Sequence, residues 1–386
     1  MTSPRELSER VDIVELSPER RRDRARFVAL PFQLAKDEPA WQPGLRMIAE
    51  RIIHPSQNPY WSRRRARFFV AVRAGDDKVV GRVGVLAPGE IPQRPTAAVL
   101  MFPDFVDDRA VVEALLDAAR RAARDFGADE LVGPLNPSIH HDLGIQVSGF
   151  EQRNAILMGY QPRYYAPQLE ALGCKTLHEF QAWWLSSDSF QREGRLASIA
   201  ERMARRPALR IRSADIHRFD EELELLFHLY SESFADHWGF TGPTIDEFRF
   251  LAGDLRALLR RNLVLIAEWN ERPVGFVLAL PDLHAILPKG SGRLTPAFLL
   301  RTISRWRRME YVRVMIAGVL PSHRAHGIHL PLFYRIACEV FAQGFRGGEI
   351  SWVMNDNTAM RRALELLGAT PTKSYRLYAM DLRPTA

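Results

Sequence analysis

The stretch that decides the fold is Val319-Leu-Pro-Ser-His-Arg-Ala-His-Gly-Ile-His329, because it joins a predicted strand to a predicted helix. Arg313–Gly318, before it, has the apolar residues of a strand, and Leu330–Ala342, after it, has apolar residues at helical spacing. Within the stretch, Arg324 and Gly327 are spaced Arg-x-x-Gly. A loop of this kind at a helix N-terminus offers backbone N–H groups to an anion, and glycine lets the backbone come close. We therefore expect a phosphate site, with a basic turn that binds nothing as the alternative.

Two halves of the chain show the same order of elements: strand, helices, hairpin, strand, helix and strand. The two predicted hairpins are formed by residues 67–72 with 79–85 and by residues 263–268 with 273–280. A repeat at a spacing of roughly 200 residues indicates a duplicated domain, since the repeats of solenoids are far shorter. The predicted organisation is an N-terminal domain over residues 1–180, a helical connector over 181–207 and a C-terminal domain over 208–386.

The motif Val319-x-Pro321-x-x-Arg324-x-x-Gly327 resembles the coenzyme A pyrophosphate loop of the GNAT acyltransferase superfamily. That loop runs Arg/Gln-x-x-Gly-x-Gly/Ala, and here His329 stands at the last small position. Glu349–Val353 resembles the fifth strand of that fold, which splays from the fourth to admit the pantetheine arm. Asn355–Gly368 resembles the helix that follows. The resemblance implies an α/β protein with two tandem GNAT folds, each a mixed, mostly antiparallel sheet flanked by helices.

The resemblance also implies an acyl-CoA co-substrate in the second half and no metal. The residues that it places at the cofactor are Ala317, Val319, Arg324, Ala325, His326, Gly327, Ile328, His329 and Asn357. In the first half the same place reads Phe102-Pro-Asp-Phe-Val-Asp-Asp-Arg109, without an Arg-x-x-Gly loop and with carboxylates that would repel pyrophosphate. We therefore expect the first domain to be degenerate, either structural or acceptor-binding.

Acylation of an amine requires a base for the amine and an acid for the leaving thiolate. The base candidates are His237, Glu349 and Asp356, and Asn355 could bind pantetheine amides or the substrate. Tyr375 is preferred to Tyr378 as the acid. Each candidate has a structural alternative: His237 packs against aromatic rings, Glu349 is solvated, Asn355 and Asp356 cap a helix, and the tyrosines pack in a sheet. A metal site at His140-His141-Asp142 is not expected, because no second cluster has ligand spacing.

Further blocks carry a narrower resemblance. They are Gly133-Pro-Leu-Asn-Pro-Ser138, Gly159-Tyr-Gln-Pro-Arg-Tyr-Tyr165 and Phe234-Ala-Asp-His-Trp-Gly-Phe240. These blocks are similar to a tandem-GNAT family that includes bacterial ceramide synthases. The resemblance implies transfer of an acyl group from acyl-CoA, or from an acyl-carrier protein, to the amine of a long-chain, sphingoid-base-like acceptor. The alternatives are an acyltransferase for a small soluble amine or amino acid, and a catalytically inactive protein that binds a lipid or partner.

The composition bears on location and partners. In 386 residues, 53 Lys and Arg outnumber 46 Asp and Glu, which favours an anionic partner, although no nucleic-acid recognition motif accompanies the charge. Cys174 and Cys338 are the only cysteines, and Met1–Arg26 has no signal peptide, so a cytoplasmic location is expected. Thr295–Arg308 mixes apolar residues with arginines, which predicts either an interfacial helix on the inner membrane or an ordinary amphipathic helix.

Overall fold

The computed structural model describes residues 10–288 and 292–383. The first nine residues of Met1–Arg26, where no signal peptide is predicted, lie outside the described part of the chain. The chain divides into two compact units. Unit 1 comprises Met1–Glu179, Pro288–Leu299 and Tyr375–Ala386, and unit 2 comprises Phe180–Leu287 and Leu300–Ser374.

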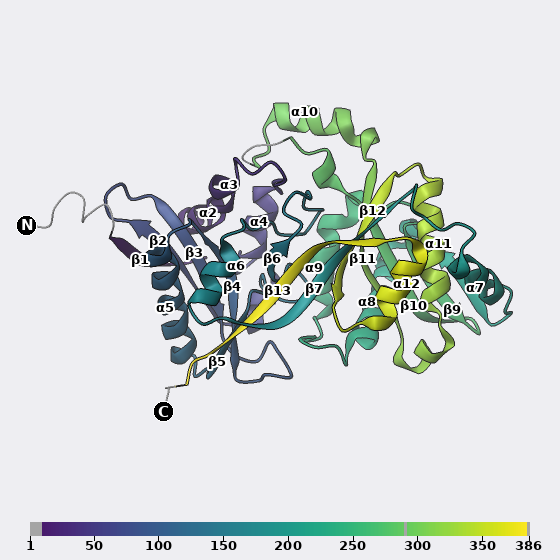
Figure 1. Cartoon of the computed structure of the whole chain (residues 1–386), viewed down its shortest axis with the longest axis horizontal. Coiled ribbons are helices and arrows are strands. Elements are labelled where there is room, and N and C mark those ends of the chain that lie inside the picture. The colour runs from purple at the N-terminus through teal and green to yellow at the C-terminus, as the bar shows by residue number, and fades with distance from the viewer. Residues whose placement is uncertain (1–9, 289–291, 384–386) are drawn as a thin grey trace, which may run out of the picture. The chain divides into compact units, whose positions relative to one another are not determined.

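Unit 1 is built on a mostly antiparallel sheet with the strand order β1-β2-β3-β4-β5-β13 (Figure 1). Its strands are β1 (Val11–Leu16), β2 (Ala66–Arg73), β3 (Val79–Leu86), β4 (Ala97–Phe105), β5 (Glu130–Gly133) and, from Tyr375 onward, β13 (Thr370–Asp381), whose first residues belong to unit 2; β6 (Ile145–Ser148) also pairs with β13. The pair β4–β5 is parallel. Its helices are α2 (Arg21–Ala29), α3 (Pro31–Leu34), α4 (Arg46–Ile52), α5 (Arg109–Asp125) and α6 (Tyr165–Ala171). The side chain of Asp108 caps α5, which buries an apolar stripe against the sheet.

Unit 2 repeats this architecture with the strand order β7-β12-β11-β10-β9-β8. Its strands are β7 (Lys175–Ser186), β8 (Leu209–Ser213), β9 (Val264–Trp269), β10 (Arg272–Pro281), β11 (Tyr311–Val319) and β12 (Gly347–Met354). Only the central pair β11–β12 is parallel among the pairings described for this unit. Its helices are α7 (Arg195–Ala204), α8 (Phe219–Phe234), α9 (Ile245–Leu255), α11 (His329–Ala342) and α12 (Thr358–Leu367), while α10 (Pro296–Arg305) is divided between the units.

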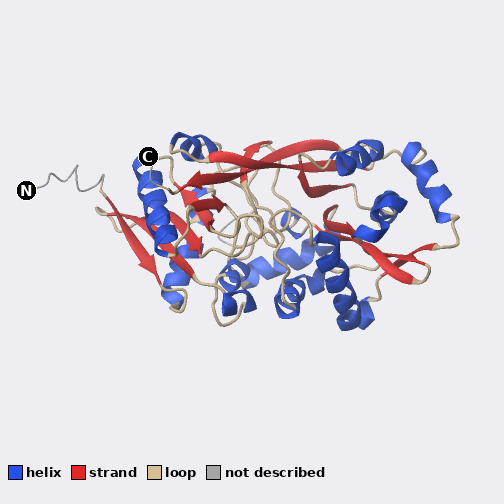
Figure 2. Ribbon diagram, turned by 90° about the horizontal axis from the view of Figure 1, so that it is seen from below, coloured by secondary structure: helices blue, strands red, loops and turns tan. Residues whose placement is uncertain are grey.

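Helices cover both faces of the unit 2 strands, as the blue and red ribbons of Figure 2 show. One core packs α7, α11 and α12 against side chains such as Leu265, Val312 and Ile350. The other packs α8 against Ile266 and Phe276. The predicted order of elements is confirmed in both halves, and the fold is the predicted mixed α/β architecture.

Each sheet contains one strand from the other half of the sequence. In unit 1, β5 pairs antiparallel with β13, with Gly133 opposite Tyr378. In unit 2, β12 pairs antiparallel with β7, with Gly347 opposite Ser186. The prediction of a helical connector over 181–207 is therefore wrong for its first part. Residues up to Ser186 extend a strand, because Trp183 and Leu185 are buried beside β12, and the helix spans only Arg195–Ala204.

Candidate functional site

The parallel strands β11 and β12 separate in the middle of the unit 2 sheet. Tyr311–Val314 pairs with Gly347–Ile350, and no pairing between the two strands continues beyond these residues. β11 is buried at Val312 and Arg313 but half exposed from Val314 to Gly318, which is unusual for a central strand. A register shift against β10 leaves Met315 as an extra residue in β11 at the point of separation. The divergence leaves one edge of β11 unpaired.

The register of β11 turns specific backbone groups toward this open edge. The Leu320 N–H donates to the Val274 carbonyl at 2.8 Å, so Val319 and Gly275 form a non-hydrogen-bonded pair. Hydrogen bonding alternates along an antiparallel ladder, so the N–H and C=O groups of Ala317 and Val319 point away from β10. These two residues are the strand positions that the sequence predicts at the cofactor.

The loop after β11 brings a helix N-terminus to the end of this edge. A 3₁₀ segment (Pro321–His326) leads into Gly327, whose φ of +72° lies in the left-handed region that favours glycine. The backbone N–H groups of Ile328 and His329, at the start of α11, donate to no other described residue. Such N–H groups, together with the helix dipole, favour an anion.

The histidines of the loop lie against aromatic rings, and the His323 and His326 rings also contact each other at 5.6 Å. The His326 ring lies 4.6 Å from the Trp269 ring, and the His329 ring lies 6.0 Å from the Phe333 ring. Burial lowers the pKa of His329, which keeps its imidazole neutral near pH 7. His329 therefore adds bulk, and not charge, at the start of α11.

Arg324 is turned toward the protein backbone. Its guanidinium donates to the Ser233 carbonyl at 2.7 Å and to the Val319 carbonyl at 3.3 Å. These two carbonyls lie near the end of α8 and at the end of β11, so the side chain ties both elements to the loop. The donors presented at the start of α11 are consequently backbone N–H groups, with Arg324 holding the loop that carries them.

His237 lies in the turn that follows α8, next to the same arginine. Its N–H donates to the Phe234 carbonyl at 2.8 Å, and its ring lies 4.8 Å from the Phe234 ring. Burial, and then the charge of Arg324, lower the pKa of His237. A neutral imidazole at pH 7 can accept a proton. The predicted packing against aromatic rings and the predicted chemical role are thus compatible.

A buried charged cluster lies where β11 and β12 separate. The Lys373 ammonium lies 2.5 Å from the Glu349 carboxylate, whose other oxygen accepts the Ser351 hydroxyl at 3.1 Å. The Arg313 Nε donates to the same Ser351 hydroxyl at 3.0 Å. All four residues are only 2–3% exposed. The alternative of a solvated Glu349 is therefore wrong.

The cluster and the apolar core occupy opposite faces of the sheet. Val312, Gly348 and Ile350 line a narrow apolar cavity of about 30 Å³ beside α11 and α12. Side chains alternate along a strand, so Arg313 and Glu349 face the opposite side, the side that α8 covers. The open edge of β11 thus has an apolar side and a charged side.

The remaining predicted residues of unit 2 have structural partners. The Asn357 side chain accepts the Met360 N–H at 3.1 Å and so caps α12. Asn355, beside it, accepts the Arg361 guanidinium on its backbone carbonyl at 3.1 Å. Asp356 is exposed, and the cap of α12 is Asn357. Capping, which was the predicted alternative for Asn355 and Asp356, thus falls to Asn357, and Asn355 lies in the turn before the helix.

The two candidate acids lie on β13 within unit 1. Tyr375 has no exposed surface and packs against Gly144. The Tyr378 hydroxyl donates to the Glu170 carboxylate at 2.8 Å. Burial and this carboxylate raise the pKa of Tyr378 above its ordinary value. Tyr378 therefore has a structural role in the packing of α6 against the strand.

Unit 1 contains the same strand divergence, but the chain itself fills it. β4 and β5 pair only over Ala97–Val99 and Glu130–Val132. Beyond this point the Leu135 N–H donates to the Leu100 carbonyl at 3.1 Å, and the Asn136 side chain accepts the Phe102 N–H at 2.6 Å. The segment that follows β5 thus turns back onto the edge of β4.

Two tyrosines close the rest of that edge. The Phe105 N–H donates to the Tyr165 hydroxyl at 3.1 Å, and the Tyr164 hydroxyl donates to the Phe105 carbonyl at 2.8 Å. The first residues of α5 carry Asp108 as a cap in place of a glycine loop. The backbone groups that are open in unit 2 are therefore bonded within the chain in unit 1, and the degeneracy of the first half stays a prediction.

Sequence reasoning missed three members of the charged cluster: Arg313, Ser351 and Lys373. A weak signal was available, because lysine is rare in this arginine-rich chain and Lys373 directly precedes the predicted strand Ser374–Met380. The structure extends this strand back to Thr370, and a lysine buried within a strand requires a partner. The partner itself, 24 residues earlier on another strand, could not be identified from spacing.

Two known proteins are similar to this chain over most of its length. It is 30% identical over 370 residues to the bacterial ceramide synthase of Caulobacter vibrioides, covering 92% of this chain and 94% of that protein. It is 28% identical over 366 residues to protein YghO of Escherichia coli, covering 92% of each. No family model matches the chain.

Solved structures show the same fold at low sequence identity. A tandem GNAT protein from the clavulanic acid biosynthesis pathway aligns over 98% of this chain and 100% of its own, with a TM-score of 0.58 and 15% identity. A GCN5-related N-acetyltransferase from Sphaerobacter thermophilus aligns over 97% of both chains, with a TM-score of 0.52 and 14% identity. The predicted tandem GNAT fold is confirmed.

No helix in residues 10–288 and 292–383 is both long enough and apolar enough to span a membrane. In the same part of the chain, His, Cys, Asp and Glu side chains form no group of three or more that could hold a metal ion.

Proposed function

Because the chain belongs to the bacterial ceramide synthase family of tandem GNAT proteins, we propose that unit 2 transfers an acyl group from acyl-CoA to the amine of a long-chain, sphingoid-base-like acceptor. The observation that carries the proposal is the open edge of β11, which ends at the N-terminus of α11. An acyl-carrier protein carries the same pantetheine arm and is the alternative donor.

The donor would bind along this open edge. The pyrophosphate would accept the N–H groups of Ile328 and His329, with Ala325, His326 and Gly327 forming the loop beneath it. The pantetheine amides would pair with Ala317 and Val319, whose backbone groups point away from β10. The thioester carbonyl would then reach the extra residue Met315, where a backbone N–H can stabilise the oxyanion.

The acceptor amine would enter from the face that α8 covers. Its nitrogen attacks the thioester carbon, the C–S bond breaks, and the amine proton passes to His237 or Glu349. His237 is favoured by its lowered pKa, and Glu349 by its place in the charged cluster at the divergence. The departing thiolate takes up a proton, so each amide formed releases one free thiol.

The proposal is tested by incubating the full chain with palmitoyl-CoA and either sphinganine or a small amine such as spermidine. Amide products are identified by mass spectrometry, and free thiol is measured with a chromogenic disulfide. We expect N-palmitoyl sphinganine with one thiol released per amide. Neither product with any amine would refute the enzymatic function, and acylation of spermidine alone would refute the long-chain acceptor.

A further inference from the structure

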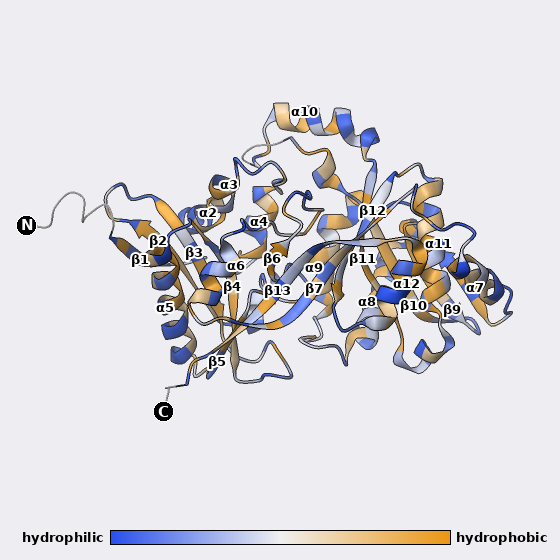
Figure 3. Ribbon diagram, viewed as in Figure 1, coloured by the Kyte–Doolittle hydropathy of each residue, from blue (hydrophilic) through white to orange (hydrophobic). Residues whose placement is uncertain are grey.

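Helix α10 has an exposed apolar face. None of its residues is buried, and Leu299, Leu300 and Ile303 are 46%, 69% and 67% exposed. Their spacing places these three side chains on one side of the helix. Figure 3 shows orange and blue alternating along α10. Most of the large apolar side chains that are exposed in the described chain belong to this region: Met47, Leu294, Leu299, Leu300 and Ile303.

The charges in this region have a single sign. Residues 294–309 contain four arginines and no Asp or Glu: Arg301, Arg305, Arg307 and Arg308. None of these four forms an ion pair with a described residue. Arginines elsewhere are paired, as Arg67 is with Glu15 and Asp125. The arginines of α10 and its C-terminal extension are therefore available to an external anion.

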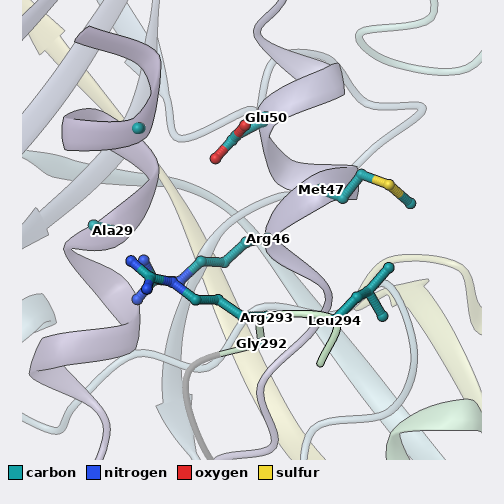
Figure 4. Close-up of a pocket in the computed structure, with 8 residues that line it drawn as sticks. Ala29, Arg46, Met47, Glu50, Gly292, Arg293 and Leu294 are labelled. Carbon is teal, nitrogen blue, oxygen red and sulfur yellow. The ribbon is translucent and has the colours of Figure 1, made fainter. Parts of the chain in front are cut away.

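A groove of about 360 Å³ lies where the chain approaches α10 (Figure 4). Its walls come from α2, α4 and Gly292–Leu294, and the Arg46 N–H donates to the Gly292 carbonyl at 3.0 Å. The side chains of Arg46 and Arg293 both line the groove, with Glu50 as its one carboxylate. Burial, and then the charge of Arg293, lower the pKa of Arg46. Two neighbouring guanidinium groups are a receptor for a phosphate group.

Exposed apolar side chains line the groove, and others follow in the chain on α10. Met47 and Leu294 line the groove and are 51% and 41% exposed. Leu294 precedes α10 by two residues, so the groove and the exposed apolar face follow one another along the chain. Exposed apolar side chains on a helix that carries Arg301 and Arg305 match the boundary between lipid headgroups and acyl chains.

We propose that the segment Gly292–Arg308, together with the groove at its start, binds an anionic lipid bilayer. Leu299, Leu300 and Ile303 enter the interfacial region, and the arginines of the segment approach lipid phosphates. Arg46 and Arg293 bind the phosphate of one headgroup. This inference is independent of the proposed reaction, because it concerns only where the protein binds.

The test is flotation of the full chain with phosphatidylcholine vesicles, with and without phosphatidylglycerol. We expect binding only to vesicles that contain phosphatidylglycerol, and weaker binding as salt is raised. Leu300→Ser with Ile303→Ser should weaken it more than tenfold, because two side chains lose their burial in lipid. Arg46→Gln with Arg293→Gln should weaken it about 25-fold, at about fivefold per arginine.

Matched controls change exposed residues elsewhere. Ile216→Ser removes an exposed apolar side chain, and Arg205→Gln with Arg206→Gln removes two exposed charges. The Ile216 control should bind as the wild type does, and the Arg205/Arg206 control should lose less than twofold. All of these residues except the half-buried Arg46 are exposed, so thermal unfolding followed by circular dichroism should stay near the wild-type temperature for every variant that keeps Arg46.

Three results would overturn the proposal. In the first, the wild type does not bind to phosphatidylglycerol vesicles. In the second, the Leu300/Ile303 variant binds to them as well as the wild type does. In the third, the wild type is a dimer that binds no vesicles, and the Leu300/Ile303 variant is a monomer. The last result would identify a second copy of the chain as the occupant. Acylation of a short-chain amine without vesicles should be the same in wild type and variants. Loss of vesicle binding with unchanged acylation would therefore concern the docking surface alone, and loss of acylation would concern the proposed reaction.

Discussion

The Asn136 side chain accepts the Phe102 N–H at 2.6 Å, and this bond closes in unit 1 the kind of strand edge that stays open in unit 2. The bond lies beyond the last residues of β4 and β5 that pair with each other. The Asn136 amide oxygen therefore occupies the position in which a carbonyl of a ligand could accept the Phe102 N–H. One duplicated fold thus has one edge bonded by its own chain and one edge free to bind a ligand.

Asn136→Ala should destabilise the chain without creating a second donor site. The part-buried Phe102 N–H would lose its acceptor, which costs about 1 kcal/mol in the free energy of unfolding. Urea unfolding measures this loss. Calorimetric titration with an acyl-CoA should give one site per chain in both wild type and variant, because Leu135, Tyr164 and Tyr165 still occupy the edge. Two sites in the wild type would contradict the closed edge.

Gly327→Ala should weaken donor binding, and Gly344→Ala should not. Both glycines flank α11 and have positive φ, of +72° and +84°, so alanine costs about 1 kcal/mol of stability at either position. Only Gly327 belongs to the loop before the helix N-terminus. The dissociation constant for acyl-CoA should rise at least tenfold for the first variant and less than twofold for the second. Equal affinities in a binding titration would argue against the loop as the pyrophosphate site.

Lys373→Met should destabilise the protein strongly. The Glu349 carboxylate would remain buried without its countercharge, which costs about 3–5 kcal/mol in the free energy of unfolding. Adding Glu349→Gln removes the stranded charge, so the double variant should regain much of that loss. A double-mutant cycle of urea unfolding measures the coupling. Additive effects of the two substitutions would contradict the buried ion pair.

Glu349→Gln also separates the two candidate bases. If Glu349 takes the amine proton, the substitution should lower kcat by about 10²–10⁴-fold with little change in the KM for acyl-CoA. If His237 takes it, His237→Gln should give that loss and Glu349→Gln a small one. Measuring kcat of each variant from pH 5 to 9 shows which of the two side chains gives the pH dependence of the reaction. Loss of kcat in neither variant would remove both residues from the mechanism.

Acid should destabilise the fold through the half-buried His141, whose ring Nε2 is buried. Burial, with the charges of His140 and Arg64, lowers the pKa of His141 to about 3. The unfolded chain, with an ordinary histidine pKa of about 6.5, binds this proton more readily. Stability is therefore fully present above about pH 6.5 and is lost as pH falls from there toward 3.

His141→Gln should flatten this pH dependence, because glutamine does not titrate. Urea unfolding at pH 7.5 and pH 5 provides the comparison. His217→Gln, at an exposed position, is the matched control and should keep the wild-type slope. An unchanged slope for His141→Gln would mean that other groups carry the acid sensitivity.

Local patterns made most of the fold predictable. Alternating apolar residues and turn residues located the hairpins β2–β3 and β9–β10, and helical spacing located α5 and α11. The Arg-x-x-Gly loop placed Gly327 before a helix, as the structure has it. Hydrogen-bond and ion-pair partners that are far apart in the sequence could not be predicted from these local patterns. The inward turn of Arg324 depends on the Ser233 carbonyl, 91 residues earlier.

The sequence by itself determined a duplicated α/β fold and a glycine loop in only its second half, because helix spacing, strand alternation and turn chemistry act over neighbouring residues. Only the tertiary structure decided that β13 completes the sheet of unit 1 and β7 that of unit 2. It alone decided that Glu349 is buried against Lys373 and that Asn136 closes one of the two strand edges. Backbone pairing and burial are set by segments that meet in space, and no local pattern specifies which segments these are.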